Sequence, residues 1–373
     1  CMKERGYPYP VDLYFEGSDQ YRGWFNSSLI IGTAAHGKAP YKTVLSHGFV
    51  LDGKGNKMSK SLGNTVDPIK LVNQYGADIV RLWATSVAYQ QDVRISDEIM
   101  KQISENYRKI RNTMRFVLGN LNDFKQSDLV AVNDLTDVDK YMLVELNNLI
   151  DGYHQAYDNY DFADANQQIL NYFTNVLSSF YMDFTKDILY IEKADSLRRR
   201  QVQTVLYYHA KAMMKLISPV LVFTAEELHD HFHCDENKAE SIFLEPNVEK
   251  VVIENSDEIK SYFDRFLLLR KDVLKVLETL RNDKVIKSNM EAKVFISLKD
   301  EFKDMAKLAD DLKQLFIVAK VELVEDNSLE EFDSAYIKAE KFNGHQCPRC
   351  WNYFDEDEIN GEVCCRCHDV ING

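Results

Sequence analysis

Two lysines and two pairs of cysteines are the residues of this chain whose types and spacing point most directly to chemistry. Lys57 and Lys60 stand three residues apart in a segment rich in glycine, serine and asparagine, after an apolar stretch that ends at Leu51. We expect a mobile loop here, and ammonium groups on such a loop can meet negative charge that develops on a phosphate chain. A lysine pair of this spacing is in most proteins a solvated basic turn, so its neighbours must decide between the two readings.

The cysteines cluster near the end of the chain, where five of the seven fall between positions 347 and 367. Two Cys-x-x-Cys pairs can each place two thiolates on one metal ion, and together they complete a tetrahedral zinc site. Such a site has no open position, so the zinc should be structural and should supply most of the folding energy of the tail. His345 and His368 are alternative ligands, and Cys364 is preferred to Cys365 because it preserves the two-residue spacing. The predicted ligands are Cys347, Cys350, Cys364 and Cys367.

A third run of interest extends from Tyr14 to Phe25. A strand pattern ends at Gly17, and a glycine there lets the backbone approach a ligand closely. The polar side chains that follow the strand suit a ribose diol and an ammonium group. An ordinary capped turn between a strand and a helix uses the same residue types, so the run alone leaves both interpretations open.

The elements that must position these residues fall into three kinds. Residues up to about 93 read as strand–helix–strand, with strands near 11–15 and 43–50, a helix near 22–35 and a helix start at Asp67-Pro68. Long amphipathic helices follow near 96–118, 136–159, 162–193 and 196–217, and a capping-box pattern at Thr224 starts another. After an irregular acidic linker, the patterns indicate a helix over 257–283, strands near 292–298 and 318–324, and a helix over 299–316.

The bulk composition bounds the class of protein. The formal net charge of −14 argues against non-specific nucleic-acid binding, although an acidic protein can carry a local basic face. No apolar run approaches the roughly 18 residues of a membrane span, and no signal peptide is visible. Cysteines clustered in this way indicate metal and a reducing compartment, hence the cytoplasm. Because the first residue is Cys1 and it begins no recognisable domain, we expect a fragment of a longer protein.

Two of these runs resemble known signatures. Lys57 to Ser61 resembles the second signature of the class I aminoacyl-tRNA synthetases, and Glu16 to Phe25 resembles the adenylate-binding signature of isoleucyl-tRNA synthetases. The resemblance covers essentially the whole chain and implies a multi-domain α/β plus α architecture. Its implied parts are the carboxyl-terminal part of a Rossmann-type catalytic domain (1–93), an all-α anticodon-binding bundle (94–235), a linker (236–256), a small α+β unit (257–340) and a zinc-binding tail (341–373).

The resemblance also implies roles for single residues. Lys60 would contact ATP and stabilise the pentavalent α-phosphate during adenylate formation, with Lys57 assisting, and Glu16 would hold the isoleucyl-adenylate. The positions that line the ribose and the amino-acid side of the adenylate are Gly17, Asp19 and Gln20. The run Ser46 to Val50 also matches the family, which places His47 near the adenine, although a half-buried strand histidine is an equally good interpretation. Tyr21 departs from the family, which often has histidine at this position.

A tRNA-binding face is implied for the helical region. The run Tyr107 to Thr113 resembles the start of the anticodon-binding bundle in class Ia synthetases. Arg108, Arg111 and Arg115 are spaced three and four apart and therefore share a helix face, which would follow the tRNA backbone. A solvated basic face is the alternative. The run Arg198 to Arg200 is a weaker second patch, and Trp351 would either stack on an RNA base or pack against the cysteine knuckle.

The implied reaction is the ATP- and magnesium-dependent activation of isoleucine, followed by transfer to tRNA(Ile), by a cytoplasmic monomer with one structural zinc ion and no membrane contact. The family's His-x-Gly-His signature and its inserted editing domain are not found in this sequence, so we expect the chain alone to be inactive. Two alternatives stay open: a valyl- or leucyl-type synthetase, and a non-catalytic tRNA-binding module.

Overall fold

The computed structural model describes residues 5–373, which fall into two compact units. The first unit contains the chain up to Arg111, together with Gly152–Leu170 and Ile217–Ala225. The second unit contains the segments Asn112–Asp151, Asn171–Leu216 and Glu226–Gly373. The long helices in the middle of the chain therefore contribute to both units.

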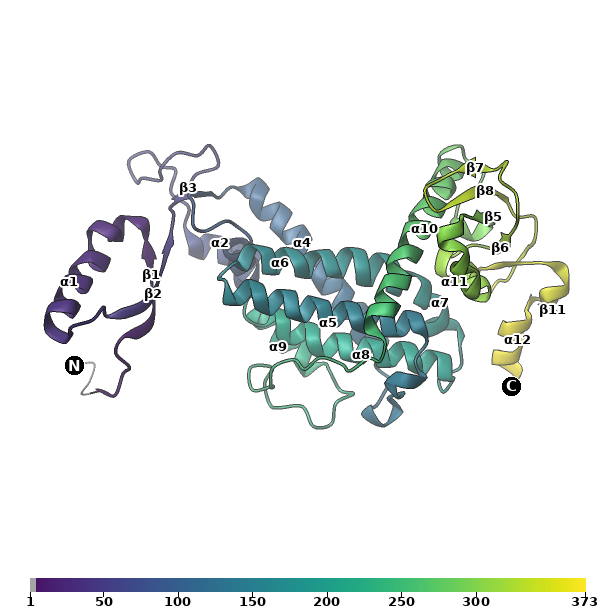
Figure 1. Ribbon diagram of the computed structural model, residues 1–373, viewed down its shortest axis with the longest axis horizontal. Helices are drawn as coiled ribbons and strands as arrows, with labels where there is room; N and C mark the ends of the chain where they lie inside the picture. The colour runs from purple at the N-terminus through teal and green to yellow at the C-terminus, as the bar shows by residue number, and fades with distance from the viewer. Residues whose placement is uncertain (1–4) are drawn as a thin grey trace. The chain divides into compact units, whose positions relative to one another are not determined.

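The first unit opens with the predicted strand–helix–strand. β1 (Val11–Gly17) pairs in parallel with β2 (Tyr41–His47), and α1 (Trp24–His36) connects them (Figure 1). Asp67 caps the next helix as predicted, because its side chain accepts a hydrogen bond from the backbone N–H of Ile69. The remaining elements here are the parallel pair β3 (Val50–Leu51) and β4 (Val93–Arg94), and the helices α2 (Pro68–Tyr75) and α3 (Ala77–Thr85).

The lysine loop shares a hydrophobic core with the two helices that follow it. Leu71 of α2 and Ile79 and Trp83 of α3 are buried together with Met100. Met58, which lies between Lys57 and Lys60 in the signature, packs against this cluster. The loop is therefore fastened to the body of the unit through an apolar side chain of the signature itself.

The predicted helical stretch is present. Its helices are α4 (Asp97–Gly119), α5 (Asp137–Asp158), α6 (Phe162–Asn171), α7 (Asp183–Ile191), α8 (Leu197–Ile217) and α9 (Val222–Asp230). Between α6 and α7, the residues Tyr172–Met182 form a π-helix, so the helix expected over 162–193 is three segments. α9 begins two residues before Thr224, because the Asp78 carboxylate accepts hydrogen bonds from the backbone N–H groups of Phe223 and Thr224.

A four-stranded sheet and two helices form the α+β part of the second unit. The strand order is β6–β5–β8–β7, with β5 parallel to β6 and antiparallel to β8. α10 and α11 lie beside the sheet (Figure 1), and the rings of Phe266 and Phe316 stack between these helices at 5.6 Å. The elements are α10 (Ser256–Asn282), β5 (Ala292–Leu298), α11 (Ala309–Phe316), β6 (Lys320–Leu323), β7 (Glu330–Glu331) and β8 (Ala335–Lys341). The sequence patterns predicted α10, β5 and β6, but not β7 or β8. The helix expected over 299–316 is a 3-10 helix over Asp300–Leu308 followed by α11.

The tail consists of short strands and one helix. Its elements are β9 (His345–Gln346), β10 (Tyr353–Phe354), β11 (Ile359–Asn360), β12 (Val363–Cys364) and α12 (Cys365–Asn372). β9 pairs with β10 and β11 pairs with β12, both antiparallel. The turn of the first hairpin carries Cys347 and Cys350, whereas Cys364 ends β12 and Cys367 lies in α12.

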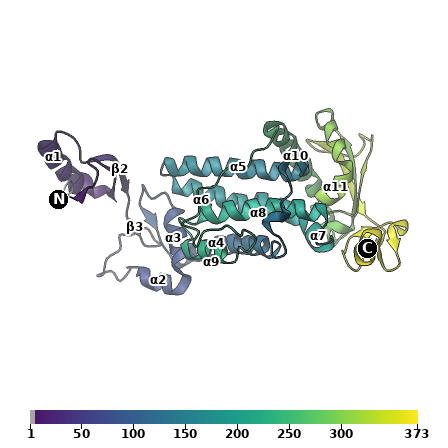
Figure 2. The ribbon, with the colours of Figure 1, turned by 90° about the horizontal axis from the view of Figure 1, so that it is seen from below.

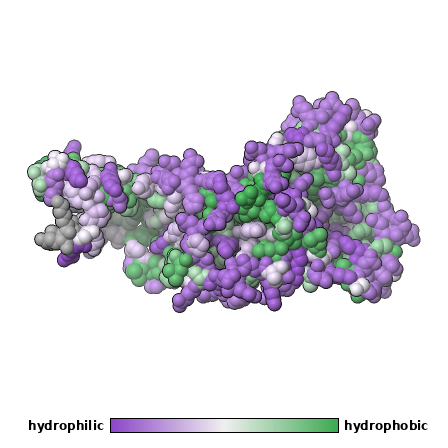
Figure 3. Space-filling model, turned by 60° about the horizontal axis from the view of Figure 1, so that its bottom comes forward, coloured by the Kyte–Doolittle hydropathy of each residue, from purple (hydrophilic) through white to green (hydrophobic). Residues whose placement is uncertain are grey.

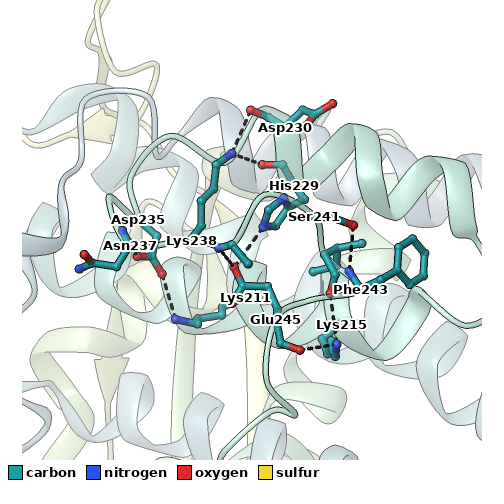
Figure 4. Close-up of polar contacts among 12 residues, drawn as sticks. Lys211, Lys215, His229, Asp230, Asp235, Asn237, Lys238, Ser241, Phe243 and Glu245 are labelled. Carbon is teal, nitrogen blue, oxygen red and sulfur yellow. Dashed lines mark hydrogen bonds and ion pairs between the residues drawn. The ribbon is translucent and has the colours of Figure 1, made fainter.

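The segment expected as a linker is irregular, but it is fastened to helices α8 and α9 (Figure 4). Lys215 donates to the backbone carbonyls of Ile242 at 3.1 Å and Glu245 at 2.6 Å. Lys211 donates to the Asp235 carboxylate at 2.9 Å. Lysine ammonium groups on backbone carbonyls satisfy polar groups that an irregular segment leaves without helix or sheet partners. The segment is therefore attached to α8 by the side chains of these two lysines.

The surface in view in Figure 3 is mostly hydrophilic, with hydrophobic residues in scattered patches. Large apolar side chains of the β1–α1–β2 piece are nonetheless exposed, including Phe15 at 53%, Ile30 at 60% and Ile31 at 67%. This piece buries little of its own apolar surface. No helix within residues 5–373 is both long enough and apolar enough to cross a membrane.

Candidate active site and metal centre

The carboxyl ends of β1 and β2 bring the adenylate-type run together with the histidine run. Because the strands are parallel and in register, Glu16 lies opposite Ser46 and Gly17 opposite His47. Ligands of open α/β sheets bind at this edge. The Glu16 side chain is exposed there, so its carboxylate is available to a ligand.

The residues after β1 lie over Gly17. A Cβ atom on Gly17 would come within 2.6 Å of an oxygen of the Asp19 carboxylate, so a larger residue here would displace the Asp19 side chain from its place over the strand end. Asp19 in turn accepts a hydrogen bond from the Gln20 side-chain amide at 3.2 Å. The Gln20 side-chain oxygen accepts from the backbone N–H of Trp24 at 2.9 Å, at the start of α1. The predicted adenylate residues are therefore adjacent and mutually oriented.

His47 occupies a half-buried position at the same edge. Its Nδ1 lies 2.8 Å from the carbonyl oxygen of Gly48, and its ring meets the Phe15 ring edge-on at 5.2 Å. Gly48 passes against another chain segment so closely that a Cβ atom would lie 2.2 Å from the carbonyl carbon of Gln91. The geometry is compatible with both interpretations of His47, as a residue near the adenine and as a strand histidine.

Both lysines of the loop have exposed side chains. Lys57 forms an isolated antiparallel bridge with Leu51 at the end of β3, and Lys60 lies in the turn that follows. The Ser59 and Ser61 hydroxyl groups face one another at 3.1 Å. The two ammonium groups therefore face solvent, while the backbone at Lys57 is bonded to the end of β3.

The four predicted cysteines form one buried cluster. Their sulfur atoms all lie within 4.8 Å of one another, and the sulfurs of Cys350 and Cys364 are 3.8 Å apart. Thiolates about 2.3 Å from a tetrahedral zinc ion would be about 3.8 Å apart, so the residues fit this metal. Burial raises the pKa of Cys347, but backbone N–H donors, led by that of Cys350, lower it to about 6. Cys365 is exposed and lies outside the cluster.

An arginine inside each cysteine pair connects the cluster to α7. Arg349 lies 3.4 Å from the Cys367 sulfur and donates to the backbone carbonyl of Ile191 at 2.9 Å. Arg366 donates to both oxygens of the Asp187 carboxylate, at 2.6 and 2.9 Å. Figure 2 shows the tail beside α7. These contacts were not predicted, although the sequence has an arginine between the two cysteines of each pair.

The predicted tRNA-binding residues have different surroundings. Arg108 is exposed and pairs with Glu105 at 2.5 Å, Arg111 donates to the Tyr107 hydroxyl at 3.3 Å, and Arg115 is exposed. All three lie on α4.

Trp351 is 67% exposed and has a left-handed backbone with φ of 66°. Its backbone N–H donates to the Cys347 carbonyl at 2.8 Å, so the knuckle fixes the backbone while the ring faces solvent. Such a ring offers a face for base stacking.

The weaker second basic patch, Arg198 to Arg200, has acidic and backbone partners within the chain. Arg198 binds the buried Asp139, and Arg199 binds Asp123 through two hydrogen bonds of 2.5 and 3.0 Å. Arg200 donates to the backbone carbonyl of Asp123. Arg198 thus joins α8 to α5, and Arg199 and Arg200 bind the turn that follows α4, so all three guanidinium groups have partners within the chain. The RNA-binding role of this run stays a prediction.

Comparison with known proteins agrees with these features. Residues 2–96 match the family of class I tRNA synthetases for I, L, M and V, and residues 139–296 match the anticodon-binding domain of tRNA ligases. An isoleucine–tRNA ligase of Geobacillus thermodenitrificans (strain NG80-2) is 48% identical over 97% of this chain and 40% of its own length. One of Bacillus subtilis (strain 168) is 51% identical over 91% of this chain and 37% of its own length.

Two solved structures share the fold at low sequence identity. One is the ternary complex of Agrobacterium radiobacter K84 agnB2 LeuRS with tRNA and LeuAMS, with a TM-score of 0.51 and 19% identity over 67% of this chain and 29% of that chain. The other is Mycobacterium tuberculosis methionyl-tRNA synthetase with methionyl-adenylate, with a TM-score of 0.52 and 22% identity over 66% of this chain and 50% of that chain. The chain spans about two fifths of the length of the curated relatives that it matches. With agreement across almost all of its residues, this chain belongs to the isoleucine–tRNA ligases, a family of class I aminoacyl-tRNA synthetases.

Proposed function

We propose that this chain is the tRNA-facing, carboxyl-terminal part of an enzyme that activates isoleucine with ATP and transfers it to tRNA(Ile). The observation that carries the proposal is the 48–51% identity to isoleucine–tRNA ligases over more than nine tenths of the chain. Valyl- and leucyl-type enzymes share the broader class I family, and the identity to isoleucine enzymes favours isoleucine over them.

Adenylate formation would use charge and position rather than a protein nucleophile. Lys60, assisted by Lys57, would meet the negative charge on the α-phosphate of magnesium-bound ATP as the carboxylate of isoleucine attacks and pyrophosphate leaves. Glu16 would hold the adenylate at the sheet edge. Gly17, Asp19 and Gln20 would line its ribose and amino-acid side, and His47 would lie near the adenine. The exposure of the two lysines and the shared edge of β1 and β2 support these roles.

The helical region and the tail would bind tRNA. Arg108, Arg111 and Arg115 would contact the phosphate backbone, and Trp351 would stack on a base. Zinc, held by Cys347, Cys350, Cys364 and Cys367, would supply a closed structural crosslink in the tail. The five parts expected from the sequence are proposed as the functional division: 1–93, 94–235, 236–256, 257–340 and 341–373. A cytoplasmic monomer is proposed for the whole enzyme.

ATP–pyrophosphate exchange by the full-length ligase tests the proposal. We expect exchange with isoleucine to exceed exchange with leucine strongly, and Lys60→Ala to lower kcat by roughly a hundredfold or more. This chain alone should show no exchange. Exchange driven best by valine or leucine, or full activity of the Lys60→Ala enzyme, contradicts the proposal. Absence of exchange with every amino acid favours the tRNA-binding module instead.

A further inference from the structure

One asparagine outside the lysine signature holds the loop together. Asn64 is half-buried, and its side-chain oxygen accepts a hydrogen bond from the backbone N–H of Ser59 at 2.9 Å. Its side-chain nitrogen donates to the carbonyl oxygen of Lys57 at 3.2 Å and to the Asp52 carboxylate at 2.9 Å. A single amide therefore fixes two backbone positions of the signature and ties both to the residue that follows β3.

Asp52 is itself a rigid anchor. Its carboxylate accepts hydrogen bonds from the backbone N–H groups of Lys54 at 3.0 Å and Asn56 at 2.8 Å. Its backbone N–H donates to the Asn56 carbonyl at 3.0 Å. The Asn64 side chain, followed by these backbone donors, lowers the pKa of Asp52 to about 2, so the carboxylate is ionised at neutral pH.

Met58 provides a second anchor for the same five residues. Its side chain packs into the core with Leu71 and Trp83, and its sulfur lies 3.3 Å from the backbone nitrogen of Val66. Two side chains thus hold the backbone of the signature: the Met58 thioether within it and the Asn64 amide that follows it. The ammonium groups of Lys57 and Lys60 nevertheless remain exposed.

We propose that Asn64 is a positioning residue for the lysine loop, forming with Asp52 a clasp that fixes residues 57–59 and directs Lys57 and Lys60 towards the phosphates of ATP. The structural part of this inference rests on the hydrogen bonds alone, and the catalytic part rests on the proposed function. Charge held in position before the reaction lowers the barrier, because the loop need not be ordered as the transition state forms.

Hydrogen exchange in this chain tests the clasp directly. Asn64→Ala removes all three hydrogen bonds and should raise the exchange rate of the Ser59 amide by roughly fivefold or more. Asn56→Ala is the matched control, because Asn56 also reaches the Asp52 carboxylate through its side chain, at 3.4 Å, and lies as far before Lys60 as Asn64 lies after it. The control should leave the Ser59 rate unchanged. An unchanged rate in Asn64→Ala overturns the clasp.

A conservative variant guards against a general folding defect. Asn64→Asp keeps an acceptor for the Ser59 N–H but loses both donors and faces the Asp52 carboxylate with like charge. It should loosen the loop as Asn64→Ala does, with trypsin cleavage after Lys60 accelerated in both variants and far-UV circular dichroism unchanged. Cleavage at the rate of the unmodified chain in both variants counts against the clasp.

The catalytic part needs the full-length ligase. Asn64→Ala should lower kcat of isoleucine-dependent ATP–pyrophosphate exchange by roughly ten- to a hundredfold, with KM for isoleucine unchanged. Asn56→Ala should stay within about twofold of the unmodified enzyme. A loosened loop with unchanged kcat overturns the positioning role. If the unmodified enzyme shows no isoleucine-dependent ATP–pyrophosphate exchange, the proposed function is overturned instead. The hydrogen-exchange result at Ser59 does not depend on that outcome.

Discussion

The Asp187 carboxylate of α7 accepts hydrogen bonds from two nitrogens of the Arg366 guanidinium, at 2.6 and 2.9 Å, and so fastens the cysteine cluster to the helical region. Arg366 lies between Cys364 and Cys367, so the cysteine cluster and the attachment share one turn of chain. Asn352 adds a further hydrogen bond to the same carboxylate, at 2.9 Å.

Loss of this contact should loosen the tail without removing its metal. Asp187→Asn weakens the ion pair, whose side chains are about a quarter to a third exposed, and after solvent screening we expect a cost of about 1 kcal/mol. Hydrogen exchange over residues 341–373 should speed up while the zinc content is unchanged. Lys303→Met, which removes an exposed ion pair with Asp300, is the control and should have no measurable effect on the tail. Unchanged exchange in Asp187→Asn contradicts the assignment.

The metal site makes a prediction that separates two neighbouring cysteines. Cys364→Ser removes a buried member of the cluster and should lose most of the bound zinc, measured by elemental analysis after dialysis. Cys365→Ser, one residue further on and exposed, should retain the full complement. Residues 341–373 should also lose hydrogen-exchange protection when a strong chelator removes the metal. Zinc retained by Cys364→Ser, or lost by Cys365→Ser, would show that the ligand set is different.

Asp78 should be among the most sensitive polar positions of the first unit. It is 6% exposed and accepts hydrogen bonds from the Thr224 hydroxyl at 2.7 Å and from two backbone N–H groups at the start of α9. Asp78→Ala leaves these buried donors without an acceptor, at a cost of about 2–4 kcal/mol in the free energy of unfolding. Asp67→Ala, which removes an exposed cap of α2, should cost about 1 kcal/mol. Chemical denaturation gives both values, and equal losses contradict the ranking.

His209 should make the second unit less stable in mild acid. The imidazole is fully buried between the Tyr172 hydroxyl and the Val205 carbonyl, and burial lowers the pKa of His209 to about 4. In the unfolded chain it takes up a proton near pH 6.5, so the unfolded state binds more protons between about pH 6.5 and 4. Stability therefore falls as the pH drops through this window, by about 3 kcal/mol in total from this group. Nuclear magnetic resonance titration measures the pKa of His209 in the folded chain, and a transition of His209 near pH 6.5 contradicts this prediction.

The sequence could predict which residues lie together because each signature is short and local. A Cys-x-x-Cys turn brings two thiols together whatever surrounds it, so the spacing predicted the cluster that the structure contains. The shared edge of Glu16 and His47 follows from the parallel pairing of two strands. The helices of the middle region were also predictable, because their apolar residues recur with a helical period over many turns.

Contacts between distant residues could not be read in this way. Arg366 and Asp187 are 179 positions apart, and no local pattern pairs them. β8 was missed although Ala335, Ile337 and Ala339 alternate into the core, because each apolar residue is small or isolated among charges. The Asn64 clasp was hidden for another reason: a segment rich in glycine, serine and asparagine predicts mobility, whereas the side-chain amide of one such residue fixes the loop.

Binding of this chain to transcripts of isoleucine tRNA and valine tRNA, with and without a zinc chelator, tests most directly the proposal that it is the tRNA-binding part of an isoleucine–tRNA ligase. We expect tighter binding to the isoleucine tRNA, and loss of that preference when the chelator removes the metal from the tail. Equal, chelator-insensitive binding to both transcripts contradicts it.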